Sequence, residues 1–88
     1  MKHISVMVID PVGLHARPAT IAVNLASKCR CNVTLEFAGR STDMKSIMGI
    51  MALGIAPQSL ITIYCDGEDE DVALKNIEET LRLQKVIS

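Results

Sequence analysis

The apolar residues of this chain switch repeatedly between two spacings, which limits the folds open to it. Where they recur at every second residue, the pattern predicts strands with one buried face. Three segments have that spacing, at residues 4–9, 32–37 and 60–65. Gly39 permits a tight turn after the second of them, so we expect a hairpin whose other strand is short and lies at 40–43.

Between these strands the spacing changes to three and four residues, which is typical of helices with one buried stripe. A first helix is predicted at about 16–28, with a stripe made of Pro18, Ile21, Ala22, Leu25 and Cys29. A short helix is predicted at 47–53, where Ser46 can cap its start and Gly54 its end. A third helix follows the acidic run 68–71, which we interpret as a solvated helix start. Its apolar positions are Ala73, Leu74, Ile77 and Leu81.

The predicted order of elements, β-α-β-β-α-β-α, indicates the α+β class. A four-stranded antiparallel sheet with three helices packed on one face would bury all the apolar stripes. The other face should meet solvent, because it would carry Ser5, Asn32, Thr34, Glu36 and Thr62. His3 is expected to be a solvent-facing strand residue. We expect one domain at 1–88, since a chain of 88 residues supports one compact core.

The charge and hydropathy of the chain exclude some classes of partner. The formal net charge is −1, which provides no field to attract nucleic acid or an anionic membrane. No apolar run approaches the roughly 20 residues that cross a bilayer, and residues 1–5 do not begin a secretory signal. We therefore expect a cytoplasmic protein without membrane insertion or direct binding of nucleic acid.

The cysteines Cys29, Cys31 and Cys65 are an odd number and lie within predicted structural segments. Reduced thiols that pack as small hydrophobic residues are the favoured interpretation, and no metal or other cofactor is expected. Cys29 and Cys31 can form half of a metal site, but neither histidine supplies the other half of a zinc pattern. A small metal-binding domain remains a weaker alternative.

Residues 13–19, Gly-Leu-His-Ala-Arg-Pro-Ala, place a titratable imidazole and a permanent cation at a loop-to-helix junction. The first turn of a helix presents free N–H groups and the positive end of its dipole, so it favours a bound anion. A phosphate on His15 can be held there, and Arg17 can add a charge-assisted fork to its oxygens. Neutral imidazole is also a competent nucleophile. His15 is therefore the candidate phosphoryl acceptor and Arg17 the residue that stabilises the phosphate.

The short helix at 47–53 is apolar on nearly every side, although two turns can direct only one stripe to a core. If Met44, Ile50 and Leu53 point inward, then Ile47, Met48 and Met51 are at least partly exposed. Flexible methionines on a surface suit docking to several partners. Complete burial of this helix is the alternative.

These motifs resemble those of HPr, the family of histidine-containing phosphocarrier proteins of the bacterial sugar phosphotransferase system. The similarity spans the chain and is carried by residues 13–19, Ala26-Ser27-Lys28, Lys45-Ser46-Ile47-Met48-Gly49 and Leu53-Gly54. It implies an open-faced β-sandwich. It also implies that His15 accepts a phosphoryl group, at Nδ1 in the family, from phosphorylated enzyme I and donates it to IIA domains of sugar permeases. The protein would then be a stoichiometric carrier and not an enzyme.

The resemblance further implies that Ser46 is a regulatory phosphorylation site linked to catabolite repression. The implied partners are HPr kinase/phosphorylase and catabolite control protein A. Thr20 joins Ile47, Met48 and Met51 as a predicted docking residue. The family usually has Asn where Asp43 stands, and this extra negative charge bears on recognition by the kinase. The alternative function is a regulatory paralogue in which Ser46 and the apolar surface act and His15 is vestigial.

Overall fold

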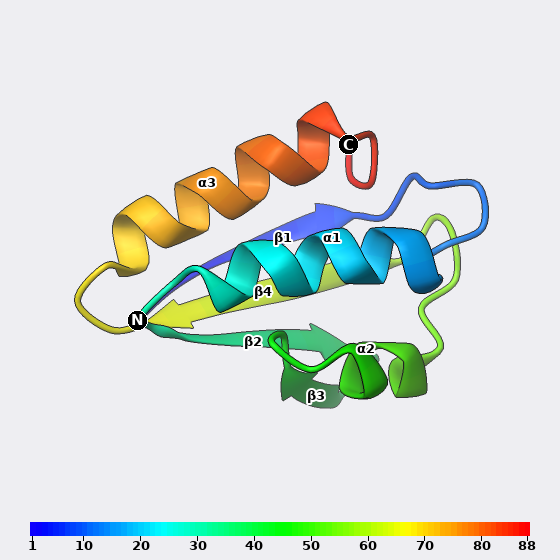
Figure 1. Ribbon diagram of the computed structural model, residues 1–88. Helices are drawn as coiled ribbons and strands as arrows, with labels where there is room; N and C mark the ends of the chain where they lie inside the picture. The colour runs from blue at the N-terminus through cyan, green and yellow to red at the C-terminus, as the bar shows by residue number, and fades with distance from the viewer.

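The computed structural model describes residues 1–88, and it has the predicted order of elements (Figure 1). The strands are β1 (Lys2–Met7), β2 (Asn32–Phe37), β3 (Arg40–Asp43) and β4 (Leu60–Asp66). The helices are α1 (Ala16–Ser27), α2 (Ile47–Leu53) and α3 (Glu70–Leu83). Most of these bounds agree with the sequence prediction to within two residues, because each change of spacing coincides with a turn or a cap.

The four strands form one antiparallel sheet in the order β1-β4-β2-β3. Ile63 lies at its centre, paired with Ile4 on one side and Leu35 on the other. All three helices cover one face of the sheet (Figure 1). The opposite face carries polar side chains that pair across strands: the hydroxyls of Ser5 and Thr62 lie 3.0 Å apart. The predicted open-faced α+β sandwich is confirmed.

The core is one continuous cluster of buried apolar side chains between the sheet and the helices. The first helix differs from the prediction in which side chains it buries. Ala19 and Ala26 are fully buried, whereas Ile21 and Leu25 are only half-buried. Small residues allow the helix backbone to approach the sheet closely, and the longer side chains then lie along its flanks. Pro18 and Ala22 of the predicted stripe are buried as expected, and Ala19 and Ala26 were missed.

The acidic run before α3 is not simply a solvated helix start, and that interpretation was wrong for two of its residues. The Asp69 carboxylate accepts hydrogen bonds from the backbone N–H groups of Arg30 (3.0 Å) and Cys31 (2.9 Å). The Glu70 carboxylate accepts from Gly67 N at 3.2 Å and pairs with the N-terminal amine at 3.1 Å. Asp69 therefore ties the loop between α1 and β2 to the start of α3, and the amide of Arg30 is the largest cause that lowers its pKa.

The three cysteines are free thiols. Cys31 and Cys65 are buried and Cys29 is half-buried, and burial is the largest cause that raises the pKa of Cys31 to about 12. No three His, Cys, Asp or Glu side chains are grouped so that they can hold a metal ion. No helix of the structure is both long and apolar enough to cross a membrane.

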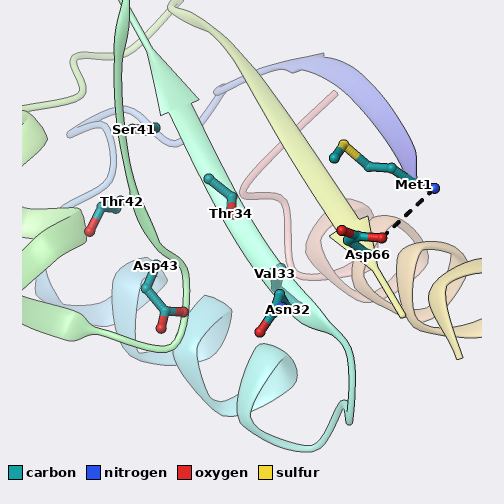
Figure 2. A pocket seen from close by; sticks show the side chains of 8 residues that line it. All are labelled: Met1, Asn32, Val33, Thr34, Ser41, Thr42, Asp43 and Asp66. Atoms are coloured by element: carbon teal, nitrogen blue, oxygen red, sulfur yellow. Dashed lines mark ion pairs between the residues drawn. The ribbon is translucent and has the colours of Figure 1, made fainter. Parts of the chain in front are cut away.

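A shallow depression of about 510 Å³ lies where β2 begins and β4 ends. Figure 2 shows its lining, which is mostly polar: Met1, Asn32, Val33, Thr34, Ser41, Thr42, Asp43 and Asp66. The N-terminal amine lies 3.9 Å from the Asp66 carboxylate at its rim. This end of the sheet is the one farther from the loop that leads into α1 (Figure 1).

Candidate functional site

The loop between β1 and α1 packs closely against the segment that follows α2. Leu14 N donates to Ile55 O at 3.0 Å, and Gly13 N donates to Asp10 O at 2.9 Å. Gly13 has a φ of +83°, and a Cβ placed there would lie 2.4 Å from Ile55 O. Only glycine fits such a left-handed position so close to another backbone. The glycine therefore fixes the path of the chain into His15.

His15 is the N-cap residue of α1, with an extended backbone (φ −81°, ψ −168°) and no side-chain capping bond. Its carbonyl accepts from Ala19 N at 2.9 Å. The N–H groups of Ala16 and Arg17 begin the helix and have no acceptor within the chain, and Pro18 has no N–H. The imidazole is 35% exposed. An anion bonded to this ring would lie within reach of the free amides at the positive end of the helix dipole.

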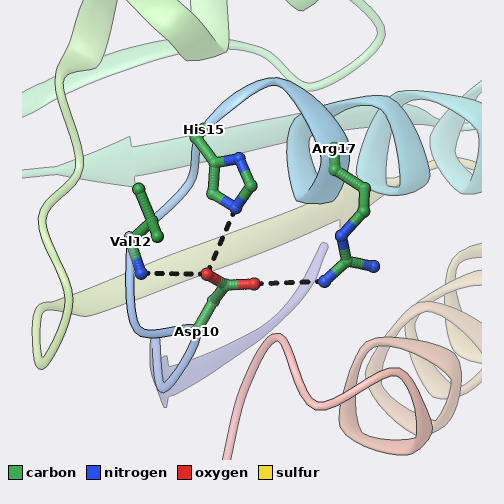
Figure 3. Close-up of polar contacts among 4 residues, drawn as sticks. All are labelled: Asp10, Val12, His15 and Arg17. Atoms are coloured by element: carbon green, nitrogen blue, oxygen red, sulfur yellow. Dashed lines mark hydrogen bonds and ion pairs between the residues drawn. The ribbon is translucent and has the colours of Figure 1, made fainter.

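A buried carboxylate, Asp10, joins the two predicted site residues (Figure 3). Its Oδ1 lies 3.2 Å from His15 Nε2 and accepts from Val12 N at 3.0 Å, and its Oδ2 accepts from Arg17 Nη2 at 3.3 Å. The Asp10 side chain is only 5% exposed. The hydrogen bond from Val12 N is the largest cause that lowers the pKa of Asp10, and the charges of His15 and Arg17 act in the same direction. The carboxyl group is therefore ionised at neutral pH.

Sequence reasoning missed Asp10, which it treated only as part of the loop that ends the first strand. The available signal was an acidic residue in the same loop as His15, five residues before it. An aspartate before proline is more often a turn residue, and Asp10 does have that role through Val12 N. Its contacts with His15 and Arg17 depend on how the loop folds back.

Arg17 lies on the first turn of α1 with its side chain 61% exposed. Its one contact with a carboxylate is the long 3.3 Å bond to Asp10 Oδ2. The remaining guanidinium donors face away from Asp10 in Figure 3. Because the side chain is long and mostly solvated, it can turn from Asp10 toward an anion on His15 at little cost.

The second predicted site, at α2, has the expected local geometry. Ser46 is the N-cap, and its Oγ accepts from Gly49 N at 3.0 Å. Gly54 ends the helix in the left-handed conformation, with φ +61°. Asp43 Oδ1 accepts from Lys45 N at 2.9 Å, so the carboxylate is engaged in the turn just before Ser46.

The division of the α2 side chains into buried and exposed is also as expected. Ile50 and Leu53 are buried, as is Met44 in the preceding turn. The exposed fractions are 41% for Ile47, 80% for Met48 and 43% for Met51. Complete burial of this helix is therefore excluded.

The fourth predicted docking residue lies on the neighbouring helix. Thr20 is exposed on α1, where its hydroxyl donates to Ala16 O at 2.7 Å. The helices α1 and α2 are packed together, so Thr20, His15 and the methionines of α2 belong to adjoining parts of the helical layer.

Comparison with known proteins assigns the chain to a family. Residues 2–82 match the model of the HPr component of the phosphotransferase system, described as its phosphorylation site. The chain belongs to the HPr family. This assignment supports the role of a phosphocarrier for the chain.

Solved structures support the same assignment. The histidine-containing phosphocarrier protein of Mycoplasma is 38% identical, with a TM-score of 0.95 and 99% of each chain covered. HPr of Thermoanaerobacter tengcongensis is 35% identical, with a TM-score of 0.90 over 98% of this chain and 96% of that one. Crh, the Bacillus subtilis catabolite repression protein, is 34% identical with full coverage of both chains and a TM-score of 0.73. The HPr fold is therefore shared with both carrier and catabolite repression proteins.

Proposed function

We propose that this HPr-family protein accepts a phosphoryl group on His15 from phosphorylated enzyme I and passes it to IIA domains of sugar permeases. The observation that carries the proposal is the position of His15 at the N-cap of α1, beside free amides and the largely exposed Arg17. The protein is regenerated at each cycle, so it is a stoichiometric carrier and not an enzyme. It needs no cofactor in this role.

Phosphoryl transfer requires a nucleophile, donors for the phosphoryl oxygens and an accessible path for the donor. The half-exposed imidazole supplies the nucleophile. The free amides of Ala16 and Arg17 at the start of α1 can stabilise the negative oxygens, and the Arg17 guanidinium can turn from Asp10 to do the same. No closed cleft is present around His15, which suits a carrier that must meet active sites supplied by its partners.

The exposed side chains Thr20, Ile47, Met48 and Met51 are proposed as the docking surface for enzyme I and IIA domains. Large apolar groups exposed together mark interaction sites, and methionines adapt to partners of different shape. One surface next to His15 can then serve both the donor and the acceptors in turn. Because both kinds of partner would occupy the same surface of this protein, they are expected to exclude each other.

We also propose that Ser46 is phosphorylated by HPr kinase/phosphorylase and that the product binds catabolite control protein A. A phosphate on the Ser46 oxygen would remain next to Gly49 N, and a helix start favours a negative charge. The same charge, placed at the edge of the Ile47 and Met48 surface, would oppose docking of enzyme I. The turn formed by Asp43 and Lys45 leaves the negative charge of Asp43 near Ser46, so the kinase must accept a substrate with this extra charge.

Mass spectrometry tests both modifications. Incubation with enzyme I and phosphoenolpyruvate should add one acid-labile phosphoryl group, which is absent from His15→Ala. Incubation with the serine kinase and ATP should add one acid-stable group, which is absent from Ser46→Ala. An acid-stable product of enzyme I, or labelling that survives His15→Ala, would contradict the carrier role.

The similarity to Crh favours a second candidate, a regulatory module that acts through Ser46 and the apolar surface. In that case His15→Ala would leave both catabolite control and sugar uptake intact. The carrier role predicts instead that the substitution abolishes sugar uptake and preserves catabolite control. Growth on a transported sugar separates the two.

A further inference from the structure

Asp10 is a buried carboxylate whose role the proposed function leaves open. Both of its oxygens are engaged, one with His15 and Val12 and the other with Arg17 (Figure 3). Burial of an ionised carboxylate is costly unless it is paired and hydrogen-bonded. A turn needs only a single acceptor, and serine or asparagine provides one without a charge. The charge of Asp10 therefore calls for a reason beyond the turn.

The contact with His15 determines which nitrogen of the ring carries the proton. An ionised carboxylate can only accept hydrogen bonds, and the pKa of Asp10 is lowered, so the carboxyl group carries no proton to donate. The ring nitrogen facing it at 3.2 Å, Nε2, must be the donor. In the neutral ring Nδ1 then keeps its lone pair, and it faces away from Asp10 in Figure 3.

We propose that Asp10 is a positioning residue for phosphoryl transfer: it holds the Nε2–H form of His15 and stabilises the positive charge that the ring gains at Nδ1. This inference rests on the proposed carrier function and deepens it. In the same way, carboxylates in other active sites orient a catalytic histidine and balance its positive charge without taking its proton.

The transfer step balances without movement of a proton. The Nδ1 lone pair of His15 forms a bond to the phosphorus of the donor's phosphoryl group. The bond between that phosphorus and the donor atom breaks, and its electron pair stays on the donor. The product ring carries the phosphoryl group on Nδ1 and the original proton on Nε2, and it is positively charged. The Asp10 carboxylate lies directly against that proton, so it stabilises the charge as it develops.

Arg17 connects this charge balance to the arrival of the phosphoryl group. Before transfer, Arg17 neutralises part of the Asp10 charge through Oδ2 at 3.3 Å. Phosphoryl oxygens on His15 would compete for the guanidinium, which is mostly exposed and able to move. When Arg17 turns to the phosphoryl group, the full charge of Asp10 becomes available to the ring. The ion pair between Asp10 and Arg17 is thus replaced by two, one between Asp10 and the charged His15 ring and one between Arg17 and the phosphoryl group.

A purely structural role for Asp10 can be tested separately, because the chain contains a second turn in which an aspartate accepts the same kind of hydrogen bond. Asp43 Oδ1 accepts from Lys45 N at 2.9 Å, just as Asp10 Oδ1 accepts from Val12 N at 3.0 Å. Asp43 has no hydrogen bond to a histidine or an arginine. Asparagine at either position retains one oxygen for the turn and replaces the other oxygen, and the negative charge, with a neutral NH2 group. Asp43→Asn is therefore a matched control for Asp10→Asn.

The experiment measures single-turnover transfer from phosphorylated enzyme I to each full-length variant over a range of concentrations. Asp10→Asn should lower the maximal rate by roughly tenfold to hundredfold with KM nearly unchanged, as loss of a charge that acts in the transition state requires. Asp43→Asn should remain within about twofold of the wild type. Urea unfolding of both variants should show that the loop is intact.

Nitrogen-15 NMR of labelled histidine gives a readout that is independent of enzyme I. At about pH 9, where imidazole is neutral, wild-type His15 should be protonated at Nε2. Asp10→Ala should lose the protected Nε2–H signal. A wild-type ring protonated at Nδ1, or an Asp10→Asn variant that transfers at the wild-type rate, would overturn the inference while the carrier function stands. Failure of enzyme I to label wild-type His15 would instead overturn the function, and with it the role of Asp10 in transfer.

Discussion

Substitution of Gly13 by alanine tests the proposal that the loop before α1 is held in one path by close backbone contact. Gly13 has a φ of +83°, and an added Cβ would lie 2.4 Å from Ile55 O and 3.0 Å from the carbonyl carbon of Ala56. Both neighbours are backbone atoms, which cannot turn away as a flexible side chain would. Either the loop or the segment around Ile55 must move.

The magnitude follows from two costs. A left-handed conformation costs an alanine about 1–2 kcal/mol relative to its preferred conformations. Movement of the loop also breaks the 3.0 Å bond between Leu14 N and Ile55 O, and Leu14 is buried. A buried donor left without its acceptor costs about 1–3 kcal/mol. We therefore expect Gly13→Ala to lower the free energy of unfolding by roughly 2–5 kcal/mol.

Gly54→Ala is the matched control, because Gly54 has a φ of +61° but no atom within 4 Å of an added Cβ. It should show only the conformational cost, about 1–2 kcal/mol. Urea unfolding followed by far-ultraviolet circular dichroism suits a chain with no Trp and one Tyr. Gly13→Ala should be the less stable by about 1–3 kcal/mol, and it should also transfer phosphate more slowly because Asp10 and His15 flank the displaced residue. Equal losses for the two variants would refute the close contact at Ile55.

Three further predictions follow from other parts of the molecule. Ser46→Ala removes the 3.0 Å capping bond from Gly49 N and should lower the free energy of unfolding in urea by about 1 kcal/mol. Ser46→Asp retains a capping oxygen and should lower it by less. Equal stability of Ser46→Ala and wild type would contradict the cap. Met48→Asp should change stability by less than about 0.5 kcal/mol, since Met48 is 80% exposed, and should raise KM for enzyme I about tenfold or more. Val72→Asp, 65% exposed on α3, should leave KM unchanged, and an equal rise would show that Met48 is not part of a specific docking surface. Folding lowers the pKa of Asp69 below its ordinary 3.8, so the ionised carboxylate stabilises the protein above that pH, and this contribution is lost as the pH falls through the lower folded value. The difference in stability between wild type and Asp69→Asn should therefore shrink below about pH 4. A difference that does not change with pH would contradict this role of Asp69.

Local patterns in the sequence predicted much of this fold. The alternation in β2 and β4 identified the residues that the sheet buries, and the Ser46 and Gly54 caps located both ends of α2. The division of α2 into a buried and an exposed stripe also followed from its length, since two turns cannot bury every side chain. In each case the information lies within about ten residues, where backbone geometry alone relates the positions.

The partly mistaken stripe of α1 shows where local patterns fail. Helical spacing identifies the buried face only to within about one residue, so it found Pro18 and Ala22 and missed Ala19 and Ala26. The distance between helix and sheet decides whether a large or a small residue fits at the point of closest approach. That distance is a property of the assembled layers, and here it selected Ala19 and Ala26.

The functional site likewise has one part that local sequence determines and another that depends on tertiary contacts. The sequence by itself determined that His15 and Arg17 stand at the start of a helix, because Gly13 and Pro18 define that junction and a helix start always presents free amides. Only the tertiary structure decided that Asp10 reaches both of them and that Asp69 ties two loops together. The physical reason is that a carboxylate in a loop bonds to whatever donors the packed backbone brings near it. Those donors are set by contacts such as Leu14 with Ile55, far apart in the chain, and not by neighbouring residues alone.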